Sequence, residues 1–142
     1  LAGGQCLDLL YENKKLNKNI IIEMYKKKTG KLFEFSFAAP YILSNSSRKE
    51  INFSKKFGLL FGLIFQIIDD LLDGENTFKK IGKTPGKDKK QGKRTLQSII
   101  GKKNVIKFCK KIIDDFIKEN SKEFYKDIIF KELLEFNLRR LK

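Results

Sequence analysis

Residues 57–73 read FGLLFGLIFQIIDDLLD, a run in which nearly every residue is apolar or glycine. A helix of this composition is buried on all sides, so we expect it at the centre of a helical protein. The run nevertheless contains Gln66, Asp69, Asp70 and Asp73. At about 100° per residue, these four side chains fall within an arc of roughly 100°. The sequence therefore predicts a core helix with one polar face.

The three carboxylates on this face have no basic neighbour along the helix, because no Lys or Arg lies between Lys56 and Lys79. Buried carboxylates without partners are costly. A hard divalent cation is the natural candidate to neutralise them, because such ions take oxygen ligands. Asp114 and Asp115 provide a contrast, since lysines stand three or four residues away and ordinary ion pairs on a solvated helix face are expected there.

The charge of the chain is strongly positive and unevenly distributed. Among 142 residues, 27 Lys and 4 Arg face 17 acids, which gives a net charge of +14. Such a charge is typical of nucleic-acid-binding proteins, but Arg, which makes the bidentate base contacts, is scarce. We therefore expect no nucleic-acid partner and keep a basic helical nucleic-acid-binding protein as the alternative from another class. Residues 79–111 hold 13 basic residues and one acid directly after the aspartates, an arrangement suited to a metal and a phosphate-bearing ligand.

Several kinds of site are excluded by composition. The chain has no His, and its only cysteines are Cys6 and Cys109, so the usual zinc sites, His-based triads and disulfide scaffolds are absent. The longest apolar stretch covers 12 residues, 57–68, whereas a membrane span needs about 20. We expect a soluble protein without a membrane span, located in the reducing cytoplasm. The chain starts with Leu1 rather than Met, which suggests a fragment.

The hydrophobic pattern predicts an all-α protein, because no stretch alternates as a strand would. We expect helices over residues 1–12, 20–43, 51–73, 95–100, 102–120 and 121–141, the second of them interrupted near Thr29 and Gly30. Polar turns are expected at residues 13–19 and 44–48, and a glycine-rich loop at residues 74–92.

Four segments of the sequence resemble the motifs of one family. Residues 65–73 resemble the second aspartate-rich motif, FQxxDDxxD, of the trans-isoprenyl diphosphate synthases. Three further segments are similar to that family's motifs and follow in its order: GQCLDL at residues 4–9, KTG at residues 28–30, and GKTPGKD with GKRT at residues 82–88 and 92–95. The chain is identified from these segments as a member of the polyprenyl synthetase family.

The resemblance implies an all-α bundle around a deep central cavity and a Mg²⁺-dependent prenyltransferase of isoprenoid biosynthesis. Members of the family condense an allylic diphosphate with isopentenyl diphosphate, through a carbocation formed when the allylic C–O bond breaks. The resemblance also implies a homodimer. The GQCLDL segment, with Gln5, and the GKTPGKD loop favour a short-chain product, either farnesyl or geranylgeranyl diphosphate.

The resemblance also assigns roles to individual residues. It implies that Mg²⁺ is bound by Asp69, Asp70 and Asp73, and that the diphosphate is bound by Lys28, Lys83 and Lys93. It places the oxygens of Thr29 and Gln66 toward the developing carbocation, so that the expected catalytic residues are Lys28, Thr29 and Gln66. Other interpretations stay open: Gln66 as a satisfied buried amide, Thr29 as a hydroxyl bonded to a backbone carbonyl, and the two loop lysines as solvated side chains.

The sequence departs from the family in length. The family's chains are about twice as long and carry a first aspartate-rich motif, which this sequence lacks. We therefore expect residues 1–142 to be the C-terminal portion of a single polyprenyl synthetase domain, inactive alone and with apolar helix faces exposed. An inactive family member that acts as a partner subunit is the alternative within the fold. The phenylalanine-rich segment 32–37 is expected in the core or a subunit interface rather than in the wall of a prenyl pocket.

Overall fold

The computed structural model describes residues 1–75, 94–126 and 128–141, and all of its regular elements in these ranges are helical. The elements are α1 (Ala2–Leu10), α2 (Lys18–Tyr25), the π-helical turn η1 (Lys26–Gly30), α3 (Lys31–Leu43), α4 (Arg48–Glu75), α6 (Leu96–Ile100), α7 (Lys102–Glu119), α8 (Ser121–Lys126) and α9 (Ile129–Arg139). The predicted all-α fold class is confirmed.

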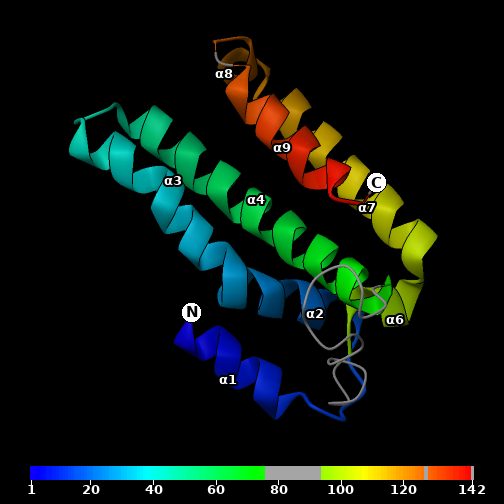
Figure 1. The fold of residues 1–142 in the computed structure, drawn as a ribbon. Coiled ribbons are helices and arrows are strands. Elements are labelled where there is room, and N and C mark those ends of the chain that lie inside the picture. Colours follow the sequence, from blue (N-terminus) through cyan, green and yellow to red (C-terminus); the bar gives the residue numbers. More distant parts are fainter. Residues whose placement is uncertain (76–93, 127, 142) are drawn as a thin grey trace.

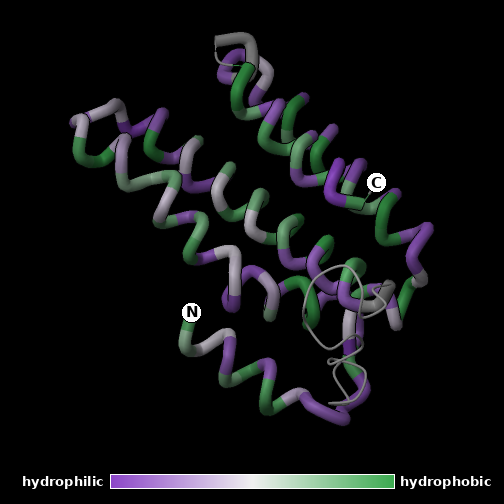
Figure 2. The backbone as a smooth tube through the Cα atoms, in the orientation of Figure 1, coloured by the Kyte–Doolittle hydropathy of each residue, from purple (hydrophilic) through white to green (hydrophobic). Residues whose placement is uncertain are grey.

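Helix α4 is the central element of the bundle. It packs antiparallel to α3 on one side and carries α7 and α9 on the other, while α1 lies beside η1 (Figure 1). Two groups of buried side chains meet along it: one gathers α2, α6 and α7 around Leu63, Ile67 and Leu71, and the other gathers α7 and α9 around Phe57, Ile64 and Ile68. Coloured by hydropathy, α4 is largely green with purple interruptions (Figure 2). The prediction that the apolar run at residues 57–73 lies in a core helix is therefore confirmed.

Length and composition alone would allow α4 to cross a membrane. Half of its most apolar window is, however, buried inside the bundle. The apolar character of α4 is thus explained by packing against other helices.

The close contact between α3 and α4 depends on two glycines. A Cβ atom added at Gly58 would lie 2.5 Å from the carbonyl oxygen of Phe33, and one added at Gly62 would lie 2.8 Å from the Cα of Gly30. Because there is no side chain at these positions, the backbone of α4 approaches the backbone of α3 at Gly58 and that of η1 at Gly62 directly. The aromatic rings of α3 then reach into the core, where Phe33 lies 5.1 Å from Phe61 between ring centroids.

Local capping explains why α4 begins at Arg48, three residues before the predicted start. The hydroxyl of Ser47 accepts a hydrogen bond from the Glu50 backbone N–H at 3.3 Å, and the Glu50 carboxylate accepts one from the Ser47 N–H at 2.9 Å. This reciprocal pair is a capping box, which satisfies two N–H groups at the helix start.

Two other boundaries bear on the predicted helices. The predicted interruption near Thr29 and Gly30 is confirmed as the π-helical turn η1. The single helix expected over residues 121–141 is wrong, since α8 ends at Lys126 and α9 begins at Ile129. Periodicity gave no signal for this break, because apolar residues continue through it.

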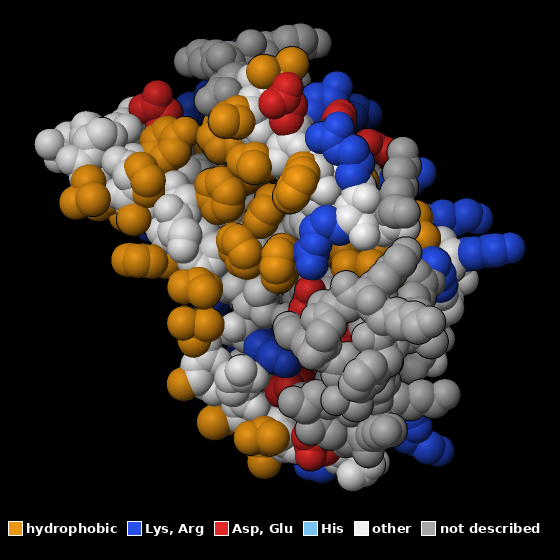
Figure 3. Space-filling model, in the orientation of Figure 1, with side chains coloured by type: hydrophobic (Ala, Val, Ile, Leu, Met, Phe, Trp, Pro, Cys, Tyr) orange, Lys and Arg blue, Asp and Glu red, His pale blue; other side chains and the backbone are white. Residues whose placement is uncertain are grey.

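Several large apolar side chains are exposed on α1, α3 and α9. The most exposed are Leu9, Leu10, Phe35, Leu43, Ile128 and Phe136. Apolar side chains gather on one face of the molecule (Figure 3). The phenylalanine-rich segment 32–37 contributes to both the core and the surface. Phe33 and Phe37 pack against the core, whereas Phe35 is 68% exposed.

The two cysteines have opposite environments. Cys109 is buried in the core, where burial raises the pKa of its thiol to about 12, whereas Cys6 is exposed on α1. Only Cys109 therefore contributes to the hydrophobic core.

We expect the thiol of Cys6 to react rapidly with Ellman's reagent at pH 8 and that of Cys109 to react only on unfolding. The pKa of an unfolded thiol is about 8.5, whereas burial raises the pKa of the Cys109 thiol to about 12. The free energy of unfolding should therefore keep its full contribution from the neutral Cys109 thiol below about pH 8.5 and lose that contribution as the pH rises toward 12. A Cys6→Ser variant that kept the fast reaction would contradict this assignment.

Gly58→Ala should lower the melting temperature measured by circular dichroism. The added methyl group would meet the α3 backbone, which costs about 1–3 kcal/mol when the helices cannot separate. Gly3→Ala on α1 is the matched control, since nothing lies within 4 Å of its Cβ position and helix propensity there favours alanine. Equal melting temperatures for the two variants would show that the close approach is not required.

Candidate functional site

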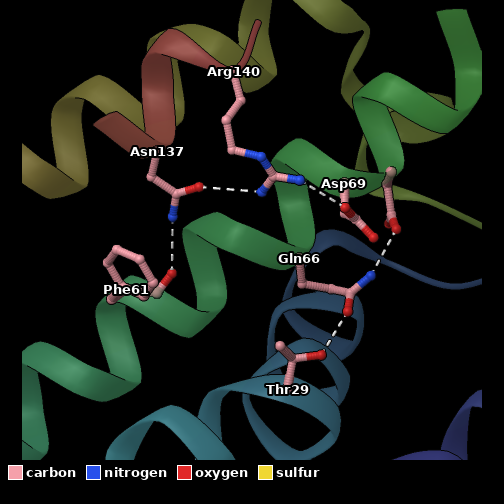
Figure 4. A network of polar contacts seen from close by, with 7 residues as sticks. Thr29, Phe61, Gln66, Asp69, Asn137 and Arg140 are labelled. Carbon is pink, nitrogen blue, oxygen red and sulfur yellow. Dashed lines mark hydrogen bonds and ion pairs between the residues drawn. The ribbon is translucent and has the colours of Figure 1, made fainter. Parts of the chain in front are cut away.

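The polar face of α4 meets the π-helical turn η1 through a chain of side-chain hydrogen bonds. Thr29 Oγ1 donates to Gln66 Oε1 at 2.5 Å, and Gln66 Nε2 donates to Asp70 Oδ1 at 2.8 Å. Figure 4 shows Gln66 lying between α4 and Thr29. Because a carboxylate only accepts hydrogen bonds, Asp70 fixes the Gln66 amide with its NH₂ group toward α4 and its oxygen toward Thr29.

The second carboxylate oxygen of Asp70 is bonded to a residue that the sequence reasoning missed. The Tyr25 hydroxyl donates to Asp70 Oδ2 and accepts a hydrogen bond from the Leu96 backbone N–H at 3.3 Å. Tyr25 lies at the end of α2 and is only 3% exposed. Its place before the KTG segment carries no motif signal in a single sequence, so only the packing of α2 on α4 reveals the contact.

Asp69 has a basic partner, which corrects the expectation that no basic side chain would neutralise these aspartates. Arg140 Nη2 donates to Asp69 Oδ1 at 2.9 Å (Figure 4). The Arg140 guanidinium also stacks over the Phe65 ring, 4.3 Å from its centroid. The side chain of Asp69 is 53% exposed. Helical spacing identifies only neighbours along α4 itself, whereas Arg140 lies at the end of α9, which packs against α4.

Lys28 turns toward α1 rather than toward the aspartates of α4. Its Nζ atom lies 2.7 Å from Asp8 Oδ2, and both side chains are largely shielded from solvent. Asp8 belongs to the GQCLDL segment, which carried the family resemblance but had not been assigned a site role. The ion pair links α1 to η1 one residue before Thr29.

The remaining expected site residues are Asp73, Lys83 and Lys93, and only Asp73 lies within the described part of the chain. Asp73 lies half-buried near the end of α4, while Lys83 and Lys93 lie outside the described residues. Among the residues described, no three acidic or cysteine side chains are grouped tightly enough to hold a metal on their own. The donors still fit a hard cation, because Asp69 and Asp73 lie four residues apart on the same face as Asp70 and offer only oxygen atoms. Magnesium usually takes one or two carboxylates together with phosphate oxygens.

The second aspartate pair behaves as expected for a solvated face. Lys111 Nζ lies 2.6 Å from Asp115 Oδ2, both side chains are exposed, and the lysine is four residues earlier on the same helix. Asp115 is thus neutralised by a lysine of its own helix, whereas Asp69 and Asp70 of α4 are bonded to Arg140 and Tyr25 from other parts of the bundle.

Comparison with known proteins identifies what the chain resembles. The family model described as polyprenyl synthetase matches residues 1–133. The chain is 30% identical over 119 residues to farnesyl diphosphate synthase of Bacillus subtilis, covering 84% of this chain and 39% of the relative. It is 33% identical over 122 residues to geranylgeranyl pyrophosphate synthase 4 of Arabidopsis thaliana, covering 81% of this chain and 32% of the relative.

The fold agrees with a solved structure of the same kind. A geranyltransferase from Helicobacter pylori, crystallised with magnesium and isoprenyl diphosphate, superposes with a TM-score of 0.78 at 25% identity, covering 99% of this chain and 46% of that one. The chain thus spans less than half the length of the proteins it matches.

Without added metal, Asp70→Ala should destabilise the protein more than Asp69→Ala. Loss of Asp70 leaves the Tyr25 hydroxyl and the Gln66 amide without their acceptor, at a cost of roughly 1–3 kcal/mol. Loss of Asp69 breaks one half-exposed ion pair, which contributes about 0–1 kcal/mol.

Urea unfolding in EDTA measures both costs, with Asp115→Ala as the surface control. An Asp69→Ala variant as unstable as Asp70→Ala would contradict the described hydrogen bonding.

Proposed function

The chain belongs to the polyprenyl synthetase family, and on this basis we propose that its parent protein condenses an allylic diphosphate with isopentenyl diphosphate. The reaction is Mg²⁺-dependent and gives a short-chain product, farnesyl or geranylgeranyl diphosphate. The observation that supports this proposal best is the hydrogen-bond chain from Thr29 through Gln66 to Asp70, because it joins the expected cation-facing and metal-facing residues in one network.

The hydrogen bond between Thr29 and Gln66 supports an electrostatic role for Thr29. Since its hydroxyl proton is directed to Gln66, its oxygen can offer only lone pairs to a group that approaches from the other side. A neutral oxygen dipole favours a developing carbocation. Such a dipole acts without reorganisation when it is fixed in advance. We assign Thr29 and Gln66 to this role.

The aspartates of α4 would hold the metal. Asp69, Asp70 and Asp73 offer hard oxygen ligands, and bound Mg²⁺ would neutralise charge on the departing diphosphate. Asp69 would exchange its Arg140 partner for this role, which is feasible because that ion pair is half-exposed. Asp70 is already oriented by its two hydrogen bonds.

Lysines would bind the diphosphate. Lys28 is held in place by Asp8, so its ammonium group is positioned before a ligand arrives. Fixed cations stabilise the transition state more than the ground state when the leaving group gains charge. Lys83 and Lys93 join Lys28 in this assignment through the family resemblance.

We further propose that residues 1–142 form the C-terminal portion of one larger domain and that they are inactive alone. The exposed apolar side chains of α1 and α3 suit a surface that the rest of the domain or a second subunit covers. A homodimer is the proposed assembly. An inactive partner subunit would share this fold, and it would give no product when the full-length protein is assayed alone with both substrates.

In the full-length protein, Asp69→Ala should reduce turnover by at least about a hundredfold, as expected when one electrostatic group of the transition state is lost. Asp114→Ala is the matched control, since Asp114 lies exposed on α7 among lysines and should leave turnover unchanged. Steady-state kinetics over a range of Mg²⁺ concentrations measure both variants, and raising the Mg²⁺ concentration should restore the turnover of Asp69→Ala only partly. Unchanged turnover in Asp69→Ala would refute the metal-site assignment.

A further inference from the structure

The buried hydroxyl of Tyr25 lies where three helices meet. It donates a hydrogen bond to Asp70 on α4 and accepts one from the backbone N–H of Leu96, the first residue of α6. An N–H group in the first turn of a helix has no acceptor within that helix. One phenol oxygen therefore satisfies a helix end and a carboxylate together, and it joins α2, α4 and α6.

The direction of the phenol proton follows from its two neighbours. A backbone N–H can only donate, so the Tyr25 oxygen must be the acceptor at Leu96. An ionised carboxylate can only accept, so the phenol proton points to Asp70 Oδ2. Gln66 occupies Oδ1 at 2.8 Å, and both oxygens of Asp70 are therefore held. The carboxylate cannot turn without breaking one of these bonds.

We propose that Tyr25 is a positioning residue for divalent-cation binding, which holds the Asp70 carboxylate in a single orientation and ties it to the start of α6. The inference rests on the proposed function, because it concerns the cation assigned above to the α4 aspartates. Hydrogen-bond partners of metal ligands contribute roughly 10–100-fold to metal affinity or activity. Tyr25 acts through Asp70 and contacts neither substrate in this assignment.

Removing the hydroxyl alone tests the proposal. In the full-length protein with inorganic pyrophosphate present, Tyr25→Phe should weaken Mn²⁺ binding at least about tenfold, measured from the electron paramagnetic resonance signal of free Mn²⁺. The KM for isopentenyl diphosphate should stay unchanged. Tyr11→Phe is the matched control, because Tyr11 also packs against the core but lies at the end of α1.

A double-mutant cycle separates positioning from packing. In an Asp70→Asn background, Tyr25→Phe should have no further effect on Mn²⁺ affinity, because the carboxylate that it orients is gone. A purely structural contribution from Tyr25 would persist in that background. Persistence of the full effect, or an unchanged Mn²⁺ affinity in the single variant, would overturn the proposal.

A spectroscopic probe keeps the test valid if Tyr25→Phe does not fold. With 3-fluorotyrosine at position 25, the ¹⁹F resonance should move when Mg²⁺ and pyrophosphate bind, whereas the same label at position 11 should not move. A static signal at position 25 in a protein that binds metal would refute the positioning role. Failure of the proposed function is distinct, since the parent protein would then bind no Mn²⁺ through Asp69 and form no prenyl product.

Discussion

Burial of α4 constrains the rest of the molecule, because a helix packed on two sides must satisfy every polar group that it carries. The amide of Gln66 and the carboxylate of Asp70 lie on this helix, and their partners come from η1 and α2. No buried side-chain nitrogen or oxygen in the described ranges lacks a hydrogen-bond partner. The same bonds that make burial possible also fix the direction of each donor and acceptor. Stability and the geometry of the candidate site thus have one physical origin.

The sequence predicted those parts of the structure that depend on neighbours along the chain. The apolar run at residues 57–73 identified the core helix, and its polar arc identified the helix face that holds Gln66 and Asp70. The interruption at Thr29 was also predicted, because a threonine followed by a glycine weakens a helix locally. These features follow from spacing, and spacing can be read from one sequence.

Contacts between distant helices could not be predicted in this way. Tyr25, Asp8 and Arg140 each contact an expected site residue, yet they lie 45, 20 and 71 positions away from it. Helical periodicity states which side chains share a face but not which helix covers that face. The failed expectation for Asp69 shows this limit, since its partner follows from how α9 packs on α4. The break between α8 and α9 was missed because the apolar pattern continues through it.

The π-helical turn η1 changes the rotation of α3 relative to α2 within one long helical segment. A π-turn accommodates one residue more than an α-helical turn, so the faces of α2 and α3 differ by about 100° from those of a continuous α-helix. This offset lets Tyr25 before the turn and Phe33 after it both point at α4. If the same residues formed a continuous α-helix, the side chains of Tyr25 and Phe33 would point in directions roughly 80° apart, and only one of them could face α4. The position of each residue relative to η1, and not only the composition of the segment, is therefore required for this packing.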